Sequence, residues 1–370
     1  MTNIVIHICK SLLLIFSFFI FPATHAQQSV PPSRMQEIYN EVKTPYKYGM
    51  VLTPPDSTKK YDCPSVFRKG KNWYMTYIVF DGRGYETWIA KSKDLLQWKT
   101  IGRILSFGDT SKGKNGTEWD ASQRAGYIAL QDHAWGGSYR LKQYRRNFWM
   151  SYIGGKETGY ESGDLSIGIA YSFGNPGRAK EWGHEPQPVL TATDKDVRWW
   201  ENKKLYKSTV IWDHDRTLGH PFVMYYNANG DTSNNTPKWR WFERIGMAVS
   251  DDMIEWKRYQ TDPVVHHKIG ITGDPMVQKI GKVWVMFYFG AFWENRKNEA
   301  FNRFACSYDL VNWTDWLGED LIQSSESYDA KYAHKPFVVK WKGVVYHFYC
   351  AVDKKDTRGI AVATSMDLKN

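Results

Sequence analysis

Ser92-Lys93-Asp94-Leu95-Leu96-Gln97-Trp98 follows a short apolar strand pattern, and the same phrase returns further along the chain. It reappears as Ser250-Asp251-Asp252-Met253-Ile254-Glu255-Trp256 and as Ser307-Tyr308-Asp309-Leu310-Val311-Asn312-Trp313. Ser365-Met366-Asp367-Leu368-Lys369-Asn370 is a copy without the tryptophan, and a degenerate copy runs from Ile169 to Trp182. Repeats of ~60–80 residues that each hold several short strands indicate a β-propeller with one blade per repeat.

Each copy ends a unit that begins with a polar turn, a short apolar strand and a second strand rich in aromatic residues and Met. Five such units predict an all-β fold, a five-bladed β-propeller that forms a single domain over residues 48–370. We expect residues 48–52 to pair with the last blade, because this closure removes exposed strand edges. Polar, Gly-rich insertions such as residues 131–146 are predicted to be functional or disordered loops.

Residues 1–26 are typical of a secretory signal peptide. Lys10 precedes an apolar stretch from Ser11 to Phe21, and Ala23-Thr24-His25-Ala26 offers a small-residue cleavage site. The apolar stretch is too short for a membrane-spanning helix. We therefore predict a secreted protein, periplasmic or extracellular, without a membrane span after cleavage, and an N-terminal linker with one helical turn at residues 27–47.

The chain carries 49 Lys and Arg against 39 Asp and Glu, a formal net charge of +10. This balance fits an acidic substrate such as a uronate-rich polysaccharide, and it fits a purely solubilising role equally well. Nucleic acid is a poor candidate partner, because the basic residues are dispersed and no nucleic-acid-binding motif appears. Cys63, Cys306 and Cys350 show no zinc-type spacing, and we expect them to be buried. We expect a monomer.

A polar residue stands just before or at the first strand of every predicted blade, at Asp62, Asp120, Glu201, Asp274 and His334. A propeller gathers these positions around one face of its axis. Two carboxylates across a pocket are what glycoside hydrolysis requires, one to protonate the leaving oxygen and one to activate water or attack. A third carboxylate raises the pKa of the acid through like-charge repulsion.

With these carboxylates and the Ser-x-Asp-Leu-x-x-Trp blade ends, residues 48–370 resemble the five-bladed propeller glycoside hydrolases. Family 43 is the most similar in organisation, and families 32, 117 and 130 are related. The resemblance implies that Asp62 is the general base, that Asp120 tunes the pKa and orients substrate, and that Glu201 is the general acid. Family 117 similarly implies Asp274 and His334 as catalytic residues, so the acid is either Glu201 or His334.

Each candidate also has a structural interpretation that the sequence leaves open. An Asp before a strand often caps a turn, Glu201 could be a solvated charge beside Lys203 and Lys204, and His334 could be a core residue. Asp213, His214 and Asp215 are interpreted as turn residues, because adjacent strand residues point to opposite faces. The predicted substrate-binding residues are Trp119, Arg124, Lys207, Trp293 and Lys335. The tryptophans would stack on sugar rings. The cations would pair with a substrate carboxylate or with the carboxylates at the starts of the first strands.

These features predict a secreted, exo-acting, inverting glycoside hydrolase that releases a terminal sugar, such as arabinofuranose, xylose or galactose, from a plant or algal polysaccharide. Its partner would be an oligo- or polysaccharide. If the net positive charge of the chain serves substrate binding, that glycan would be acidic. We expect no cofactor and no catalytic metal, and a structural Ca²⁺ on the propeller axis stays open. Two alternatives are a non-catalytic carbohydrate-binding propeller, since Glu201 lacks the Glu-Gly-Pro context of family 43, and a phosphorylase similar to family 130.

Overall fold

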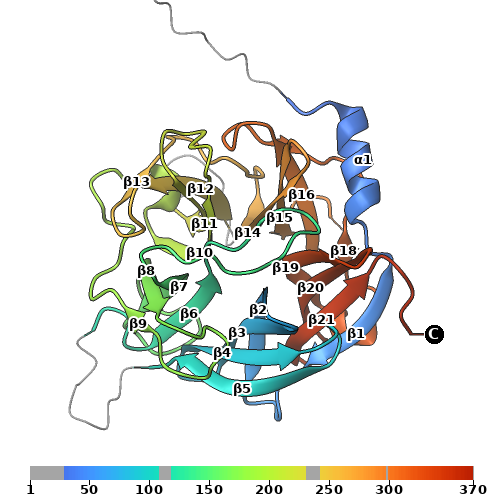
Figure 1. Ribbon diagram of the computed structural model, residues 1–370, viewed down its shortest axis with the longest axis horizontal. Helices are drawn as coiled ribbons and strands as arrows, with labels where there is room; N and C mark the ends of the chain where they lie inside the picture. The colour runs from blue at the N-terminus through green and yellow to red at the C-terminus, as the bar shows by residue number, and fades with distance from the viewer. Residues whose placement is uncertain (1–28, 108–117, 231–241, 297–298, 370) are drawn as a thin grey trace, which may run out of the picture.

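The computed structural model describes residues 29–107, 118–230, 242–296 and 299–369. The predicted signal peptide lies outside these residues, so export stays a prediction. Within the described part of the chain, antiparallel pairings divide the strands into five units arranged around a central axis (Figure 1). We call these units blades 1 to 5, in chain order of their innermost strands. The β-propeller predicted from the repeats is confirmed.

The first two blades are linked by a single parallel pairing, Tyr85 with Gln123. Blade 1 holds β2 (Lys60–Lys69), β3 (Asn72–Phe80), β4 (Tyr85–Ser92) and β5 (Trp98–Leu105). Blade 2 holds β6 (Gln123–Ile128), β7 (Phe148–Gly155), β8 (Leu165–Ser172) and the short β9 (Gly183–His184).

The next two blades are linked in the same way, by parallel pairing of β12 with β14. Blade 3 follows the 3-10 turn η2 (Trp199–Glu201) and holds β10 (Lys204–Trp212), β11 (Phe222–Asn229), β12 (Phe242–Ser250) and β13 (Trp256–Arg258). Blade 4 holds β14 (Gly270–Ile280), β15 (Val283–Ala291), β16 (Ala300–Ser307), β17 (Thr314–Asp315) and β18 (Ile322–Gln323).

Blade 5 closes the ring with strands from both ends of the chain. It holds the 3-10 turn η3 (Ser327–Asp329), β19 (Tyr332–Trp341), β20 (Val344–Val352) and β21 (Arg358–Thr364), and β1 (Tyr46–Leu52) pairs with β21. The segment expected to be a linker contains the helix α1 (Pro32–Val42), longer than one turn. Its apolar residues Met35, Ile38 and Val42 are buried in the core, which explains why the helix stays on the ring.

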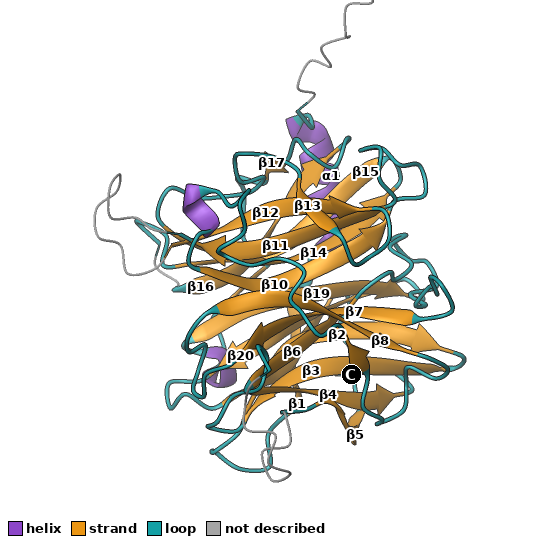
Figure 2. Ribbon diagram, turned by 90° about the vertical axis from the view of Figure 1, so that its left-hand side faces the viewer, coloured by secondary structure: helices purple, strands orange, loops and turns teal. Residues whose placement is uncertain are grey.

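The repeated phrase is a turn between the third and fourth strands of a blade. In the first copy, the backbone N–H groups of Leu96 and Gln97 donate to the Asp94 carboxylate, and Trp98 donates its indole N–H to the Leu95 carbonyl. Copies two and three repeat these bonds through Asp252 and Asp309. The repeat is therefore structural, a local turn that precedes the fourth strand of blades 1, 3 and 4. Figure 2 shows the strands filling the body of the ring and the helical turns at its edge.

Four innermost strands carry a β-bulge near their N-terminal ends. The register shifts between Asp62 and Ser65, Leu205 and Ser208, Gly273 and Met276, and His334 and Phe337. In three of the four bulges the first extra residue has positive φ and precedes a proline: Cys63 (47°), Asp274 (53°) and Lys335 (59°). A bulge re-aims side chains at the end of a strand, so it decides which of these residues face the axis.

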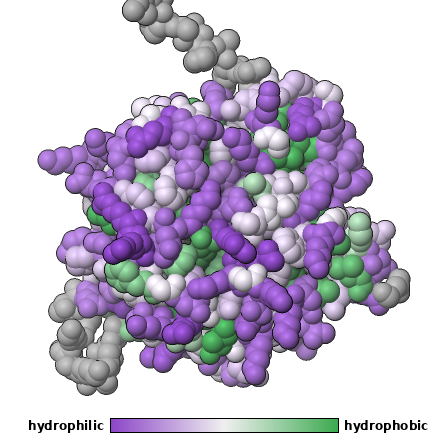
Figure 3. Space-filling view, in the orientation of Figure 1, coloured by the Kyte–Doolittle hydropathy of each residue, from purple (hydrophilic) through white to green (hydrophobic). Residues whose placement is uncertain are grey.

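Residues 130–147, here named the closing segment, cross the far ends of the innermost strands. The Arg68 N–H donates to the Tyr139 carbonyl (2.8 Å), the Trp135 N–H to the Lys279 carbonyl (3.0 Å) and the Lys340 N–H to the Tyr139 hydroxyl (2.8 Å). These bonds tie the segment to blades 1, 4 and 5. Figure 1 shows it as the teal-green loop across the centre of the ring, and atoms cover this centre in Figure 3.

In the parts of the chain that the structure describes, the helices lack the combined length and apolar character that crossing a membrane requires.

Candidate active site

A pocket of about 380 Å³ opens at the end of the axis opposite the closing segment, where the innermost strands begin. All five blades or their loops contribute to its lining. The polar lining includes Lys60, Glu161, Lys207, Asn227, Glu243, Asp274, Lys335 and Arg358, and the aromatic lining includes Tyr127, Tyr160, Tyr206, Phe242, Phe289, Phe292 and Tyr332. A concave pocket with aromatic walls and several converging charged groups is the usual form of a small-molecule binding site or active site.

The four bulges determine which first-strand residues reach this pocket. By register, Cys63, Tyr206, Asp274 and Lys335 occupy the same bulge position in blades 1, 3, 4 and 5, and all four line the pocket. Asp62 is instead equivalent to Gly273 and His334, one residue earlier. An alignment of the blades by their Asp residues would equate Asp62 with Asp274, but the strand register places Asp62 one position earlier.

Asp62 is buried and held by two cations. Its Oδ2 accepts from Lys335 Nζ at 3.0 Å and from Arg358 at 2.6 Å. Burial alone would raise the pKa of Asp62, but the charges of Lys335 and Arg358 hold that pKa well below its usual range. Asp62 is thus a stabilised anion with both oxygens engaged, because its Oδ1 accepts from the Cys63 backbone N–H at 2.9 Å.

Glu243, at the start of β12, has the opposite environment. Among the described residues no cation forms an ion pair with it, and Asn227 Nδ2 donates to its Oε2 at 2.6 Å. Burial, and then the negative charges of Glu161 and Asp274, raise the pKa of Glu243 to about 8. A carboxyl group that is protonated at neutral pH is suited to act as a general acid.

Glu161 lies in the loop between β7 and β8 and has positive φ (50°). Lys204 Nζ donates to its carbonyl oxygen at 2.7 Å, and the Gln123 amide donates to the nearby carbonyls of Glu157 and Gly159, so the loop is fixed. Its carboxylate has a long bond from the Tyr85 hydroxyl (3.3 Å) and no ion pair among the described residues. Burial raises the pKa of Glu161, and Lys335 partly offsets this effect.

This geometry agrees with the comparison against solved structures. The chain is 52% identical to the protein of a BT0996 RGII complex and to a structure described as a glycoside hydrolase, each with a TM-score of 0.87. Both alignments span 92% of this protein and 97% of the other. The chain is a glycoside hydrolase. No family model matches the sequence, and no curated protein matches it.

More distant structures share the fold of this hydrolase. A thermostable family-43 glycoside hydrolase is 19% identical with a TM-score of 0.56, and a family 117 glycoside hydrolase from Zobellia galactanivorans is 15% identical with a TM-score of 0.59. The alignment with the family-43 structure spans 84% of this protein and 91% of the other chain, and the alignment with the family 117 structure spans 90% and 93%. The predicted resemblance to this group is confirmed at the level of fold.

The structure brings half of the predicted site residues to the pocket of the hydrolase. Asp274, His334, Lys207 and Lys335 line it, and Asp62 lies against the Lys335 and Arg358 side chains. His334 is 6% exposed, Nδ1 lies 3.2 Å from the Cys350 carbonyl, and burial lowers the pKa of His334 to about 3. A neutral imidazole of this kind is a poor proton donor at neutral pH.

The other five lie in the blades away from the pocket. Asp120 is buried against Arg124 (3.1 Å) and the Tyr152 hydroxyl (2.8 Å). Trp119 packs against Gly154, where an added Cβ would lie 2.1 Å from its ring, and Trp293 stacks on His267 at 4.1 Å. Glu201 is fully buried in a bonded network. The catalytic and binding roles predicted for these residues stay untested predictions.

The sequence interpretation missed three polar residues that line the pocket, Glu161, Glu243 and Asn227. The sequence prediction considered only the beginnings of first strands, but in an antiparallel blade the third strand begins at the same end as the first. Glu243, the second residue of β12, could have been found by that rule. No sequence signal marks Glu161, because its place depends on long-range bonds to Gln123 and Lys204.

Asp62, His334 and Cys350 are the described residues whose ligand atoms lie within 4.8 Å of one another in a metal-like cluster. Thiol and imidazole groups are not the oxygen ligands that Ca²⁺ takes, and Lys335 and Arg358 already occupy the carboxylate. The cluster therefore does not suit the structural Ca²⁺ that the sequence left open.

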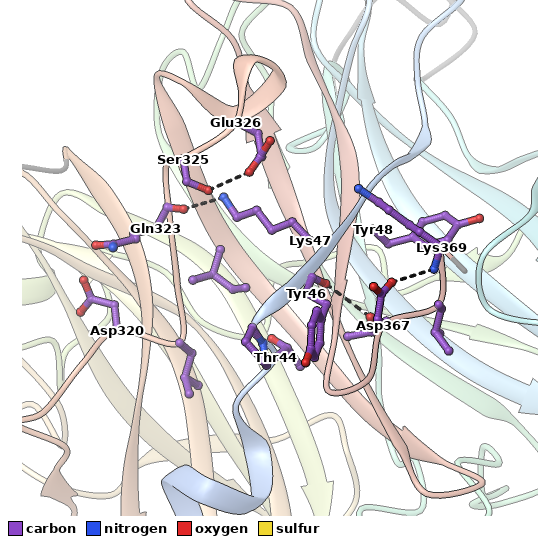
Figure 4. A pocket seen from close by; sticks show the side chains of 15 residues that line it. Thr44, Tyr46, Lys47, Tyr48, Asp320, Gln323, Ser325, Glu326, Asp367 and Lys369 are labelled. Atoms are coloured by element: carbon purple, nitrogen blue, oxygen red, sulfur yellow. Dashed lines mark hydrogen bonds between the residues drawn. The ribbon is translucent and has the colours of Figure 1, made fainter.

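A second depression, of about 450 Å³, lies at the outer edge of the ring beside β1 (Figure 4). Its polar groups bind one another: Lys47 donates to the Gln323 carbonyl at 2.6 Å, and the Ser325 hydroxyl donates to Glu326 at 3.2 Å. It is remote from the bulged strands, so it is not our candidate site.

Glu201→Gln is expected to lower stability without lowering turnover. Glu201 is fully buried, forms an ion pair with Arg258 Nε (2.8 Å) and accepts a hydrogen bond from the Tyr226 hydroxyl (2.5 Å). Glutamine removes the negative charge, so less negative charge offsets the buried Arg258 guanidinium. Breaking a buried pair of this kind costs about 3 kcal/mol. Thermal unfolding and kcat of the folded variant check this prediction. A large fall in kcat at unchanged melting temperature would restore the catalytic role predicted from the sequence.

Proposed function

We propose that this hydrolase acts on the outer end of a glycan and releases one terminal sugar, with Glu243 as general acid and Glu161 as the second catalytic carboxylate. The observation that carries this proposal is the contrast between the pocket carboxylates. Asp62 is bound to two cations, whereas Glu161 and Glu243 have no ion pair among the described residues and share one pocket. Pairs of acids with distinct environments are typical of acid and base assignments.

The closed axis supports exo action. The closing segment covers the far ends of the innermost strands, and we infer from this cover that the pocket opens only where those strands begin. A blind pocket of about 380 Å³ accommodates the end of a glycan and not its middle. Inversion of the anomeric centre is the stereochemistry that the family resemblance implies, and ¹H NMR of the first-formed anomer tests it.

The substrate we propose is a glycan of the type named for the 52% identical relative, which was solved as a BT0996 RGII complex. The released sugar would be arabinofuranose, xylose or galactose. The test is to incubate purified protein with RGII and with a panel of plant and algal polysaccharides in phosphate-free buffer, and to separate the products by anion-exchange chromatography. A single monosaccharide product supports the proposal, and internal fragments or a strict need for phosphate would overturn it.

The alkaline limb of kcat/KM is expected near pH 8, because Glu243 must carry a proton to act as the acid and its pKa is raised to about 8. Asn227→Asp replaces the amide donor by a second negative charge beside Glu243. This change raises the pKa of Glu243 further, so the alkaline limb moves upward by about one pH unit. A pH–rate profile of both proteins checks the direction, and an unmoved limb would remove Glu243 from the acid role.

A further inference from the structure

Lys207 is a buried cation whose hydrogen-bond donors are unused. The residue is 3% exposed, and its Nζ has no hydrogen-bond partner among the described residues. The Nζ lies 3.7 Å from Asp274 Oδ2 and 5.5 Å from the centre of the Tyr127 ring. Burying an ammonium group without hydrogen bonds is costly, so such a group inside a pocket points to a ligand that accepts from it.

The fold aims Lys207 and Asp274 at the same space. Lys207 belongs to the β10 bulge and Asp274 to the β14 bulge, and both line the pocket. Their separation of 3.7 Å allows charge attraction but is too long for a hydrogen bond. The pair therefore presents a donor and an acceptor side by side, both with capacity for a ligand.

The buried charges around this pair are already balanced. Asp62 engages Lys335 and Arg358, and Lys207 faces Asp274. The pocket also holds Glu161, which has no ion pair among the described residues, and Glu243, whose pKa is already raised by the negative charges of Glu161 and Asp274. A carboxylate on the bound sugar would therefore be repelled by acids of the pocket. Sugar hydroxyls avoid this cost, because a hydroxyl accepts from an ammonium and donates to a carboxylate.

We propose that Lys207 and Asp274 together bind two adjacent hydroxyls of the terminal sugar, and that this sugar is neutral and not a uronic acid. The inference rests on the proposed function, in that it places the released sugar in this pocket. It also separates two roles of charge: the basic surface can attract an acidic polymer, while the pocket itself selects a neutral end group.

The experiment compares wild type with Lys207→Met, using Lys282→Met, an exposed lysine on the β14–β15 turn, as the matched control. Substrates are the glycoside of the released sugar and its analogues lacking one hydroxyl each. Lys207→Met is expected to lower kcat/KM about 10- to 100-fold, since a hydrogen bond to a charged group is lost. For wild type, kcat/KM should fall by a similar factor when the substrate lacks the hydroxyl bound by Lys207. For Lys207→Met, removing the same hydroxyl should lower kcat/KM almost no further.

Three outcomes would overturn the proposal. Lys207→Met could keep the wild-type kcat/KM. The effects of the substitution and of removing a hydroxyl could add in full for every deoxy analogue. Wild type could release a uronic acid. Asp274→Asn provides a second variant with the same expectation if Lys207→Met unfolds, as judged by its melting temperature. If wild type releases no sugar at all, the proposed function fails, and titration of L-arabinose, D-galactose and D-galacturonate by ligand-observed NMR still tests the pair. Neutral sugars should then bind to wild type and Lys282→Met, but not to Lys207→Met.

Discussion

Glu243→Gln is expected to reduce kcat on a natural glycan about 1,000-fold, within the range that general acid catalysis supplies. Glutamine keeps the shape of the side chain, and its amide can still bind Asn227, but it has no proton to give to the leaving oxygen. An aryl glycoside with an activated leaving group needs little protonation, so its kcat should fall far less. Steady-state kinetics with both substrates check this difference.

Glu86→Gln is the matched control for Glu243→Gln. Glu86 is the second residue of β4, as Glu243 is of β12, but it binds Arg103 at 3.0 Å and does not line the pocket. It should retain wild-type kcat on both substrates. Equal losses for the natural and the activated substrate in Glu243→Gln would contradict the role of general acid and indicate a different function for this carboxyl.

Glu161→Ala is expected to have the largest effect, a loss in kcat of about 10,000-fold on natural and activated substrates alike. The second carboxylate either activates water or attacks the sugar, and the leaving group does not relieve the need for it. Added azide or formate should partly restore turnover of the activated substrate, because a small anion can occupy the space that the side chain leaves. Kinetics with and without the anion, and the anomer of the product, are the measurements.

Glu157→Ala serves as the control for Glu161→Ala, since Glu157 is exposed in the same loop and contacts the Gln123 amide through its backbone carbonyl. Wild-type kinetics are expected for it. If Glu161→Ala kept substantial activity on both substrates, the second carboxylate would be sought at Asp274.

The fold could be predicted because its signal is local and repeated. The Ser-x-Asp-Leu-x-x-Trp phrase encodes a turn closed by its own side chains, such as Asp94 with Leu96 and Gln97. Repetition of that turn after several short strands determines a propeller, and the ring then specifies which ends of the strands converge. Asp274, Lys207 and Lys335 were found in this way.

The site was harder to predict because its details depend on register and on distant partners. A bulge moves the pocket-facing position from Asp62 to Cys63, and only the pairing of Asp62 with Ile78 and of Ser65 with Thr76 reveals it. Nothing near Asp62 in the sequence shows that Lys335 and Arg358, almost 300 residues later, bind its carboxylate. The position of Glu161 likewise depends on residues outside its own loop, namely Gln123 of β6 and Lys204 of β10.

The closing segment has a consequence for turnover. Under the proposed exo action, the cover that residues 130–147 form over the far side of the ring means that a cleaved sugar leaves through the opening by which the glycan arrived. The next glycan end binds only after that sugar has left. Free monosaccharide should therefore compete directly with substrate, and the enzyme should dissociate from its polymer after every cut instead of advancing along it.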